Sequence, residues 1–360
     1  MPNHWKCCIP VVALAVLTGC PTPPKTLPRV TPIVDAPLPA PTPVPPPELP
    51  KTNLPSVAPA AVKLPAKQWV SLNEWIQANG LEAPKRFDSG WGPTFRSRSS
   101  NGVFSLTVGS RVAYWNGLAL ALGFVPQLTN GQAFLHALDL TKNVAPLHSS
   151  PLLTVKQPRL VVIDPGHGGT DTGAKSASNQ GWEKDYTLDW ALRVRPLLTA
   201  RGWKVMLTRT ADVDLPRIER VRFAERAKAD LFVSLHFNSV ESPSAGADHT
   251  GVETYCLTPT GMPSNLTRGY KDDPSAVFPN NTFDTQNLQF ALQLHRAMVR
   301  SSERTDRGIR RARFMTVLRE QNRPAVLLEA GYLSDPHEAR LIATPGYRQK
   351  LAEAVAKALE

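Results

Sequence analysis

The chain has 360 residues and a formal net charge of +11 at pH 7. Apolar residues make up 42% of it, which is enough for a sizeable core and excludes a chain that is disordered throughout. The Lys and Arg residues are scattered and form no block, so nothing predicts a nucleic-acid-binding arm. A basic surface of this kind suits either simple solubility or attraction to an anionic polymer.

The first 20 residues have the pattern of an export signal. Lys6 is a positive start, and residues 7–17 form an apolar run too short to cross a bilayer. The run leads into Leu-Thr-Gly-Cys, which ends at Cys20 and resembles the lipobox of bacterial lipoproteins; an ordinary signal with a chance cysteine is the alternative. We therefore expect residues 1–20 to be a lipoprotein signal, with Cys20 lipidated. The protein would then be exported and anchored in the cell envelope or periplasm. Pro21, rather than Asp, follows the cysteine, which is compatible with an outer membrane.

Residues 21–67 are dense in proline and contain no aromatic residue. Such a segment buries too little apolar surface to fold, so we expect an extended linker. Once the signal is removed, only Cys20 and Cys256 remain, and no disulfide framework is expected. Cys256 lies in an apolar run and is expected to be a buried, inert thiol.

Residues 68–150 predict a small β-rich domain. Ser71 precedes an expected helix, with Glu74 at the spacing of a capping box. The later segments alternate and are separated by Asn-Gly turns at 116–117 and 130–131. This part loosely resembles the N-terminal domain of copper amine oxidase type, a likeness that implies no copper site. We expect a structural or wall-binding module.

Residues 158–360 alternate strand and helix patterns, which predicts an α/β fold with a mostly parallel central sheet flanked by helices. A stretch rich in Pro, Gly, Asn and Asp at 258–284 predicts a surface insertion, which would be either a passive loop or a lid. In a lid, Asp272, Asp273 or Asp284 would reach a metal. The expected strands are 160–164, 204–209, 231–236, 252–257, 314–318 and 325–329, and the expected helices are 184–200, 217–228, 285–302 and 347–359.

Four polar side chains stand where strands end or a helix starts. His167 lies in Asp-Pro-Gly-His-Gly-Gly and His236 in Ser-Leu-His-Phe-Asn, each after an apolar strand, where open α/β sheets bind ligands. Glu183 begins an amphipathic helix, and Glu329 ends an apolar run, where a carboxylate is costly to bury unless it is paired or functional. Two histidines and two carboxylates are the parts of a hydrolytic zinc site. The remaining histidines are expected to be structural: His136, His148, His249, His295 and His337.

The same stretches exclude other kinds of site. The glycine-rich turn lacks the third glycine of a dinucleotide fingerprint and the lysine of a phosphate loop. The chain has no His-Glu-x-x-His run, which excludes a helix-borne zincin site. It has no Gly-x-Ser-x-Gly elbow, which argues against a serine hydrolase.

In this order, the four motifs resemble the zinc-dependent N-acetylmuramoyl-L-alanine amidases, a family of bacterial cell-wall hydrolases. The likeness spans residues 160–359 and includes Glu-Ala-Gly-Tyr-Leu-Ser at its end. It implies that His167, Glu183 and His236 hold Zn²⁺ and that Glu329 is the general base. The implied reaction is hydrolysis of the amide bond between N-acetylmuramic acid and L-alanine of peptidoglycan, in wall remodelling, daughter-cell separation or recycling.

The resemblance extends to Arg220 and Asn238, which would orient substrate or a ligand. Phe237 and Glu225 stand where the family often has other residues, so fine specificity stays open. The implied partners are peptidoglycan, the membrane through the lipid anchor and an activator protein; no nucleic acid is implied.

Two alternatives remain at this point. A metal hydrolase with the same ligands would instead act as a peptidase within the stem peptide, because the motifs bind metal and do not name the scissile bond. A wall-binding scaffold with little turnover is the other alternative, against which the complete set of four site residues argues.

Overall fold

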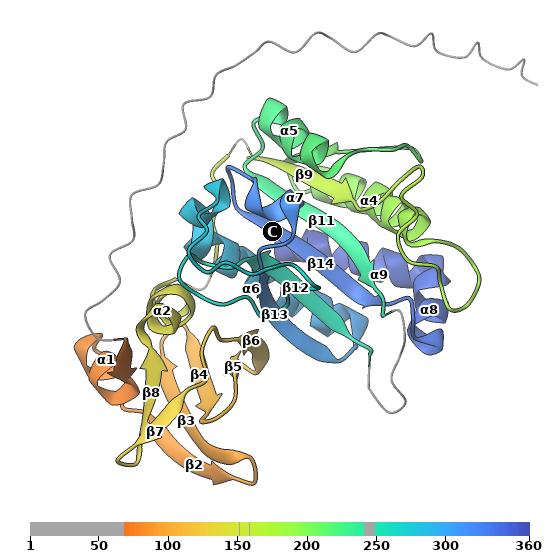
Figure 1. The fold of residues 1–360 in the computed structure, drawn as a ribbon. Helices are drawn as coiled ribbons and strands as arrows, with labels where there is room; N and C mark the ends of the chain where they lie inside the picture. The colour runs from red at the N-terminus through yellow and green to blue at the C-terminus, as the bar shows by residue number, and fades with distance from the viewer. Residues whose placement is uncertain (1–67, 151, 158, 241–248) are drawn as a thin grey trace, which may run out of the picture. The chain divides into compact units, whose positions relative to one another are not determined.

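The computed structural model describes residues 68–150, 152–157, 159–240 and 249–360 (Figure 1). The predicted signal with its lipidated cysteine and the proline-rich linker lie outside these ranges. No helix within the described ranges has the length and apolar character that crossing a membrane requires.

The strands of the C-terminal part lie in the order β10-β9-β11-β14-β12-β13. Neighbouring strands run parallel, except that β12 and β14 are antiparallel (Figure 1). The prediction of a mostly parallel α/β sheet is therefore confirmed. The strands are β9 (Arg159–Pro165), β10 (Trp203–Leu207), β11 (Leu231–Asn238), β12 (Val252–Leu257), β13 (Asp306–Ala312) and β14 (Ala325–Tyr332).

Helices cover both faces of this sheet because the side chains of its strands alternate between two apolar layers. Val161 and Ile163 of β9 face the layer of α4, α6 and α9, whereas Val162 faces α5 and α7. Each of these three side chains is fully buried, which stabilises the fold by about 1.5–3 kcal/mol apiece. The helices are α4 (Glu183–Thr199), α5 (Arg217–Ala227), α6 (Asp284–Ser302), α7 (Thr316–Arg319), α8 (Pro336–Ala343) and α9 (Pro345–Ala358).

One predicted strand is wrong. Residues 314–318 are not a strand, because helix α7 begins at Thr316. Its buried Val317 and Leu318 pack against β12 and β14. A short apolar run does not distinguish a strand from one turn of helix. The strand that the sequence missed is β13, which lies between β12 and β6. Its sequence Asp-Arg-Gly-Ile-Arg-Arg-Ala does not look like a buried strand, because one of its buried side chains is Arg311.

Residues 68–150 form a small β module. The Asn-Gly turns are confirmed, since Asn116 and Asn130 both have positive φ, as their glycines do. The predicted capping box is absent, because the hydroxyl of Ser71 donates instead to Gln132 across the β1–β8 pair. The elements are β1 (Trp69–Ser71), α1 (Leu72–Ala78), β2 (Lys85–Ser89), β3 (Gly92–Ser99), β4 (Gly102–Thr107), β5 (Val112–Trp115), β6 (Leu118–Ala121), β7 (Gln127–Thr129), β8 (Gln132–His136), α2 (Ala137–Asp139), the π-helix η1 (Leu140–Val144) and α3 (Ala145–Ser149).

The small β module continues the central sheet. Strand β6 pairs in parallel with β13, which extends the sheet through β5, β4 and β3 to β2. The backbone N–H of Ala119 donates to Asp306 at 2.9 Å, and Arg311 donates to Asn143 at 2.9 Å. Cys256 is fully buried beneath Arg311, so the expectation of a buried thiol is confirmed, and burial raises the pKa of that thiol.

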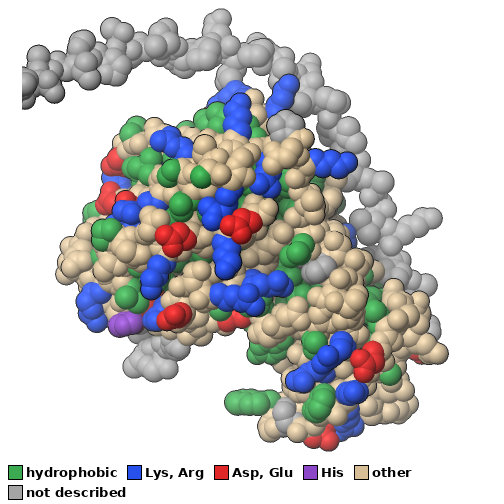
Figure 2. Space-filling model, turned by 180° about the vertical axis from the view of Figure 1, so that it is seen from behind, with side chains coloured by type: hydrophobic (Ala, Val, Ile, Leu, Met, Phe, Trp, Pro, Cys, Tyr) green, Lys and Arg blue, Asp and Glu red, His purple; other side chains and the backbone are tan. Residues whose placement is uncertain are grey.

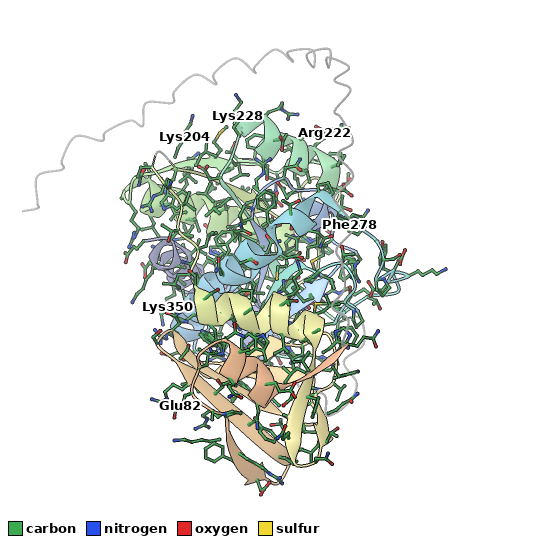
Figure 3. All side chains as sticks on the ribbon, turned by 90° about the vertical axis from the view of Figure 1, so that its left-hand side faces the viewer. Glu82, Lys204, Arg222, Lys228, Phe278 and Lys350 are labelled. Atoms are coloured by element: carbon green, nitrogen blue, oxygen red, sulfur yellow. The ribbon has the colours of Figure 1, made fainter. Side chains whose placement is uncertain are left out.

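The insertion at 258–284 is held against the C-terminal α/β part. Arg313 is fully buried and donates to Asp272 at 2.8 Å and to the carbonyl of Pro259 at 2.9 Å. The guanidinium of Arg319 lies 5.2 Å from the ring centre of Phe278, which Figure 3 labels on this segment. The insertion ends in a short 3-10 helix, η2 (Pro279–Phe283), from which α6 continues.

Basic residues are distributed over the face of the molecule seen in Figure 2. Figure 2 shows Lys and Arg side chains spread over one face of the molecule, with acidic side chains between them. On this face the pattern agrees with the scattered charge seen in the sequence.

Candidate functional site

The carboxyl ends of three neighbouring strands bring the predicted site residues together. His167 lies two residues beyond β9, and His236 and Glu329 are register neighbours on β11 and β14. Glu183 is the first residue of α4. All four line one cavity of about 450 Å³.

Three of these side chains form a compact donor cluster. His167 Nε2 lies 3.2 Å from Glu183 Oε2, and His236 Nδ1 lies 2.9 Å from Glu183 Oε1. The donor atoms of the three residues all lie within 4.8 Å of one another, close enough to bind a single metal ion. Burial opposes the charge of Glu183, but the hydrogen bonds from both imidazoles outweigh it and hold the pKa of this carboxyl far below its usual range, so the carboxylate is charged.

Glycine makes room for this cluster. A Cβ at Gly166 would collide with the imidazole of His236, and a Cβ at Gly173 would lie 2.7 Å from both Glu183 and His167. His167 itself has φ +61°, a strained conformation for a residue with a side chain. The glycine-rich turn is thus shaped around the positions of the two imidazoles.

Asp171 orients His167 from the side away from the cluster. Its Oδ1 lies 2.7 Å from His167 Nδ1, which leaves Nε2 free to face Glu183. Hydrogen bonds to Glu183 and Asp171 raise the pKa of His167 although burial opposes the rise. Carboxylates that accept from the second ring nitrogen fix the tautomer of metal-binding histidines.

Glu329 is the free carboxylate of the site. It is 5% exposed, and its Oε2 has no hydrogen-bond partner among the described residues. Burial, and after it the charge of Glu183, raises the pKa of Glu329 well above its usual value, while the charge of Arg268 opposes the rise. An unpartnered carboxylate oxygen beside a donor cluster of this kind is the arrangement that a general base requires.

Arg220 supports the loop that carries His167. Its guanidinium donates to Asp164 at 2.7 Å, to the carbonyl of Pro165 at 2.8 Å and to that of His167 at 2.8 Å. The residue lines the cavity, but these bonds occupy its donors. The contacts therefore suit the orientation of a ligand better than direct binding of substrate.

Asn238 links two residues that the sequence did not single out. Its Nδ2 donates to Glu253 at 3.0 Å, and its Oδ1 accepts from Arg268 at 2.7 Å. Glu253 carried the same signal as Glu329, since it is a carboxylate within an apolar strand. Asp171 carried a weaker signal in the glycine-rich turn, and Arg268 carried none, because the insertion has no periodic pattern.

The other candidate ligands lie elsewhere. His295 is buried between Thr254 and Asp306, with ring nitrogens 3.0 and 2.8 Å from them. The ring of His249 is 6.4 Å from that of Tyr332. The three acids proposed for a lid are engaged with other partners: Asp272 with Arg313, Asp273 with Ser275 and Asp284 with Lys142.

The donor set suits zinc. Two imidazoles and one carboxylate are a recurrent ligand set of catalytic zinc sites, in which a fourth position stays open for water. Such sites also use a nearby proton acceptor, and the carboxylate of Glu329, with its unpartnered oxygen, lies beside this cluster. An α/β sheet that carries such a donor cluster at the carboxyl ends of its strands is typical of metal-dependent hydrolases.

Comparison with known proteins identifies the family. The sequence profile described as N-acetylmuramoyl-L-alanine amidase matches residues 161–360, and the chain belongs to this family. It is 29% identical over 262 residues to the amidase AmiA of Salmonella typhimurium strain LT2, covering 67% of this chain and 89% of the relative. It is 31% identical over 220 residues to AmiA of Escherichia coli K12, covering 55% and 74%. The solved catalytic domain of CwlV from Bacillus (Paenibacillus) polymyxa var. colistinus is 33% identical, with a TM-score of 0.45, covering 56% of this chain and 95% of that domain.

Proposed function

We propose that this protein hydrolyses the amide bond between N-acetylmuramic acid and L-alanine in peptidoglycan, with Zn²⁺ held by His167, Glu183 and His236. The observation that carries the proposal is the convergence of this donor cluster with the unpartnered carboxylate oxygen of Glu329 in one cavity. Membership of the amidase family supplies the class of reaction and the substrate.

Each residue of the proposed site has its own role in the reaction. A bound zinc ion would polarise the scissile carbonyl and acidify water at the open position. Glu329 accepts the proton from that water and delivers it to the nitrogen of L-alanine, which leaves as an amine. Its pKa, raised by burial, brings the carboxyl closer to the range in which it both takes and returns a proton. Asp171 and Arg220 hold His167 and its loop in place during this exchange.

The remaining assignments rest on the sequence. We propose that residues 1–20 are a lipoprotein signal with Cys20 lipidated and that 21–67 is a linker. The β-rich domain would be 68–150 and the amidase domain 158–360. The protein would then be exported, anchored in the cell envelope and active on the wall during remodelling, separation or recycling. An activator protein and a wall-binding role for the small β module belong to the same proposal.

Mass spectrometry of wall digests separates this function from a stem peptidase. Purified protein is incubated with isolated peptidoglycan, and the soluble products are identified. An amidase releases intact stem peptides that begin with L-alanine and leaves lactyl groups on the glycan. Products in which L-alanine is still joined to muramic acid would overturn the proposed bond and favour a peptidase. A protein that binds peptidoglycan but releases neither kind of product would favour the scaffold.

A further inference from the structure

Arg268 reaches the cavity from the insertion at 258–284. It lines the cavity together with His236 and Glu329, and its Nη2 donates to Asn238 Oδ1 at 2.7 Å. The side chain of Arg268 is exposed, and its charge acts on the carboxyl of Glu329. A guanidinium thus stands beside the site where the scissile bond would lie.

This guanidinium is positioned but not neutralised. No carboxylate in the described parts of the chain forms an ion pair with Arg268, whereas the deeper Arg220 is paired with Asp164 at 2.7 Å. Asn238 is fixed from behind, because its Nδ2 donates to the buried Glu253 at 3.0 Å. The amide oxygen of Asn238 therefore faces Arg268 and accepts from one of its N–H groups. The other N–H groups of the Arg268 guanidinium are left to bind an incoming anion.

The position of Arg268 suits one anionic group of the stem peptide. Asn238, its anchor, is two residues from the proposed ligand His236, so at most roughly 7 Å of extended chain separates them. In peptidoglycan, L-alanine is followed by a D-glutamate that is joined to the next residue through its side-chain carboxyl. Its α-carboxyl is left free in some walls and amidated in others, and it also lies within two residues, roughly 7 Å, of the scissile bond.

We propose that Arg268 binds the free α-carboxylate of the second stem residue and makes this enzyme prefer unamidated stems. A guanidinium fork matches a carboxylate with two parallel charge-assisted hydrogen bonds. An amide offers one acceptor and turns an NH₂ group toward the guanidinium donors. The amidated stem should therefore bind Arg268 more weakly than the stem with a free carboxylate. This inference rests on the proposed amidase function and adds substrate specificity to it.

The test compares two soluble muropeptides that differ only in a carboxylate or a carboxamide at that position. With the full chain, we expect kcat/KM to be about 10- to 100-fold higher for the carboxylate, the range of a hydrogen bond to a charged group. Arg268→Gln should bring the ratio close to one by raising KM for the carboxylate substrate, with kcat little changed. Arg268→Lys should retain part of the preference, because it keeps the charge but not the fork.

Arg217→Gln is the matched control, since it removes the other exposed cation of the cavity. This variant should keep the preference of the parent. Equal cleavage of both muropeptides by the parent would overturn the assignment of Arg268 and leave the amidase function standing. An equal loss of kcat on both substrates in Arg268→Gln would also overturn it, by showing that the guanidinium serves the reaction itself. Failure of the parent to cleave either amide bond would overturn the amidase function and this inference together.

Discussion

Glu329 is buried in a position where its charge lowers the stability of the fold. Its Oε2 makes no hydrogen bond within the described residues that would offset this cost. We predict that Glu329→Gln lowers kcat by about 10²- to 10⁴-fold, the usual worth of a general acid–base group. Because the amide carries no charge, the variant should unfold at a urea concentration no lower than that of the parent. Zinc content and the unfolding midpoint are the controls. A variant that keeps full turnover would show that another group moves the proton.

Asp171 acts on the proposed metal only through His167. Asp171→Ala should weaken zinc affinity by about 10- to 100-fold, as the loss of such outer contacts does elsewhere. Competition with a chromophoric chelator measures this without reference to activity. Asp273→Ala is the control and should bind zinc like the parent, because the hydrogen bonds of this carboxylate within the described ranges come from Ser275. Equal affinities in the two variants would remove Asp171 from the site.

At the scale of elements, the insertion depends on one buried cation. Arg313 holds residues 259–272 through Asp272, Pro259 and Met262. Arg313→Met should lower the free energy of unfolding by about 2–4 kcal/mol, because it removes the guanidinium from the partly buried Asp272 and from the carbonyls of Pro259 and Met262. It should also open the insertion to limited proteolysis.

Lys271→Met is the matched control in the same segment, since Lys271 is exposed. It should leave both the unfolding midpoint and the cleavage rate of the insertion unchanged. If Arg313→Met is cut no faster than this control, the insertion is held by contacts other than the buried guanidinium.

The small β module contains a histidine that should make its stability sensitive to acid. His148 packs against Trp75 and Trp115, and neither ring nitrogen has a hydrogen-bond partner among the described residues. Burial lowers the pKa of His148 to about 4 from 6.5. The unfolded chain therefore takes up the proton first, so stability is complete above pH 6.5 and is lost as pH falls towards 4.

The expected loss is about 2–3 kcal/mol between pH 7 and pH 4.5. Urea unfolding at the two values should show a smaller difference in His148→Leu than in the parent. His337→Leu, at an exposed position, should keep the difference of the parent. The same acid sensitivity in both variants would mean that other groups cause it.

At the scale of the whole molecule, the sequence predicted the interior of the sheet well because β9, β11 and β14 are long apolar runs bounded by polar residues. It failed at β13, where Arg311 is buried against Cys256 and Asn143 rather than among apolar side chains. Pattern alone does not reveal a buried cation whose partners come from distant segments.

The site, like the fold, has residues that the sequence predicted and residues that it did not. His167, Glu183, His236 and Glu329 carried local signals, since each is a polar residue at a strand end or helix start. Arg268 carried no such signal, because only the folded insertion brings it to Asn238. The pairing of β6 with β13 could not be predicted from the sequence either, because neither segment carries a local pattern that indicates its partner strand.

The most direct test of the central claim is the amount of new N-terminal L-alanine released from peptidoglycan by the full chain. It is measured before chelation, after chelation and after zinc is restored. We predict release by the parent, loss of release with the chelator, and recovery with one equivalent of zinc. Release that persists once the metal has been removed, or release of a different amino terminus, would contradict the account of a zinc-dependent amidase.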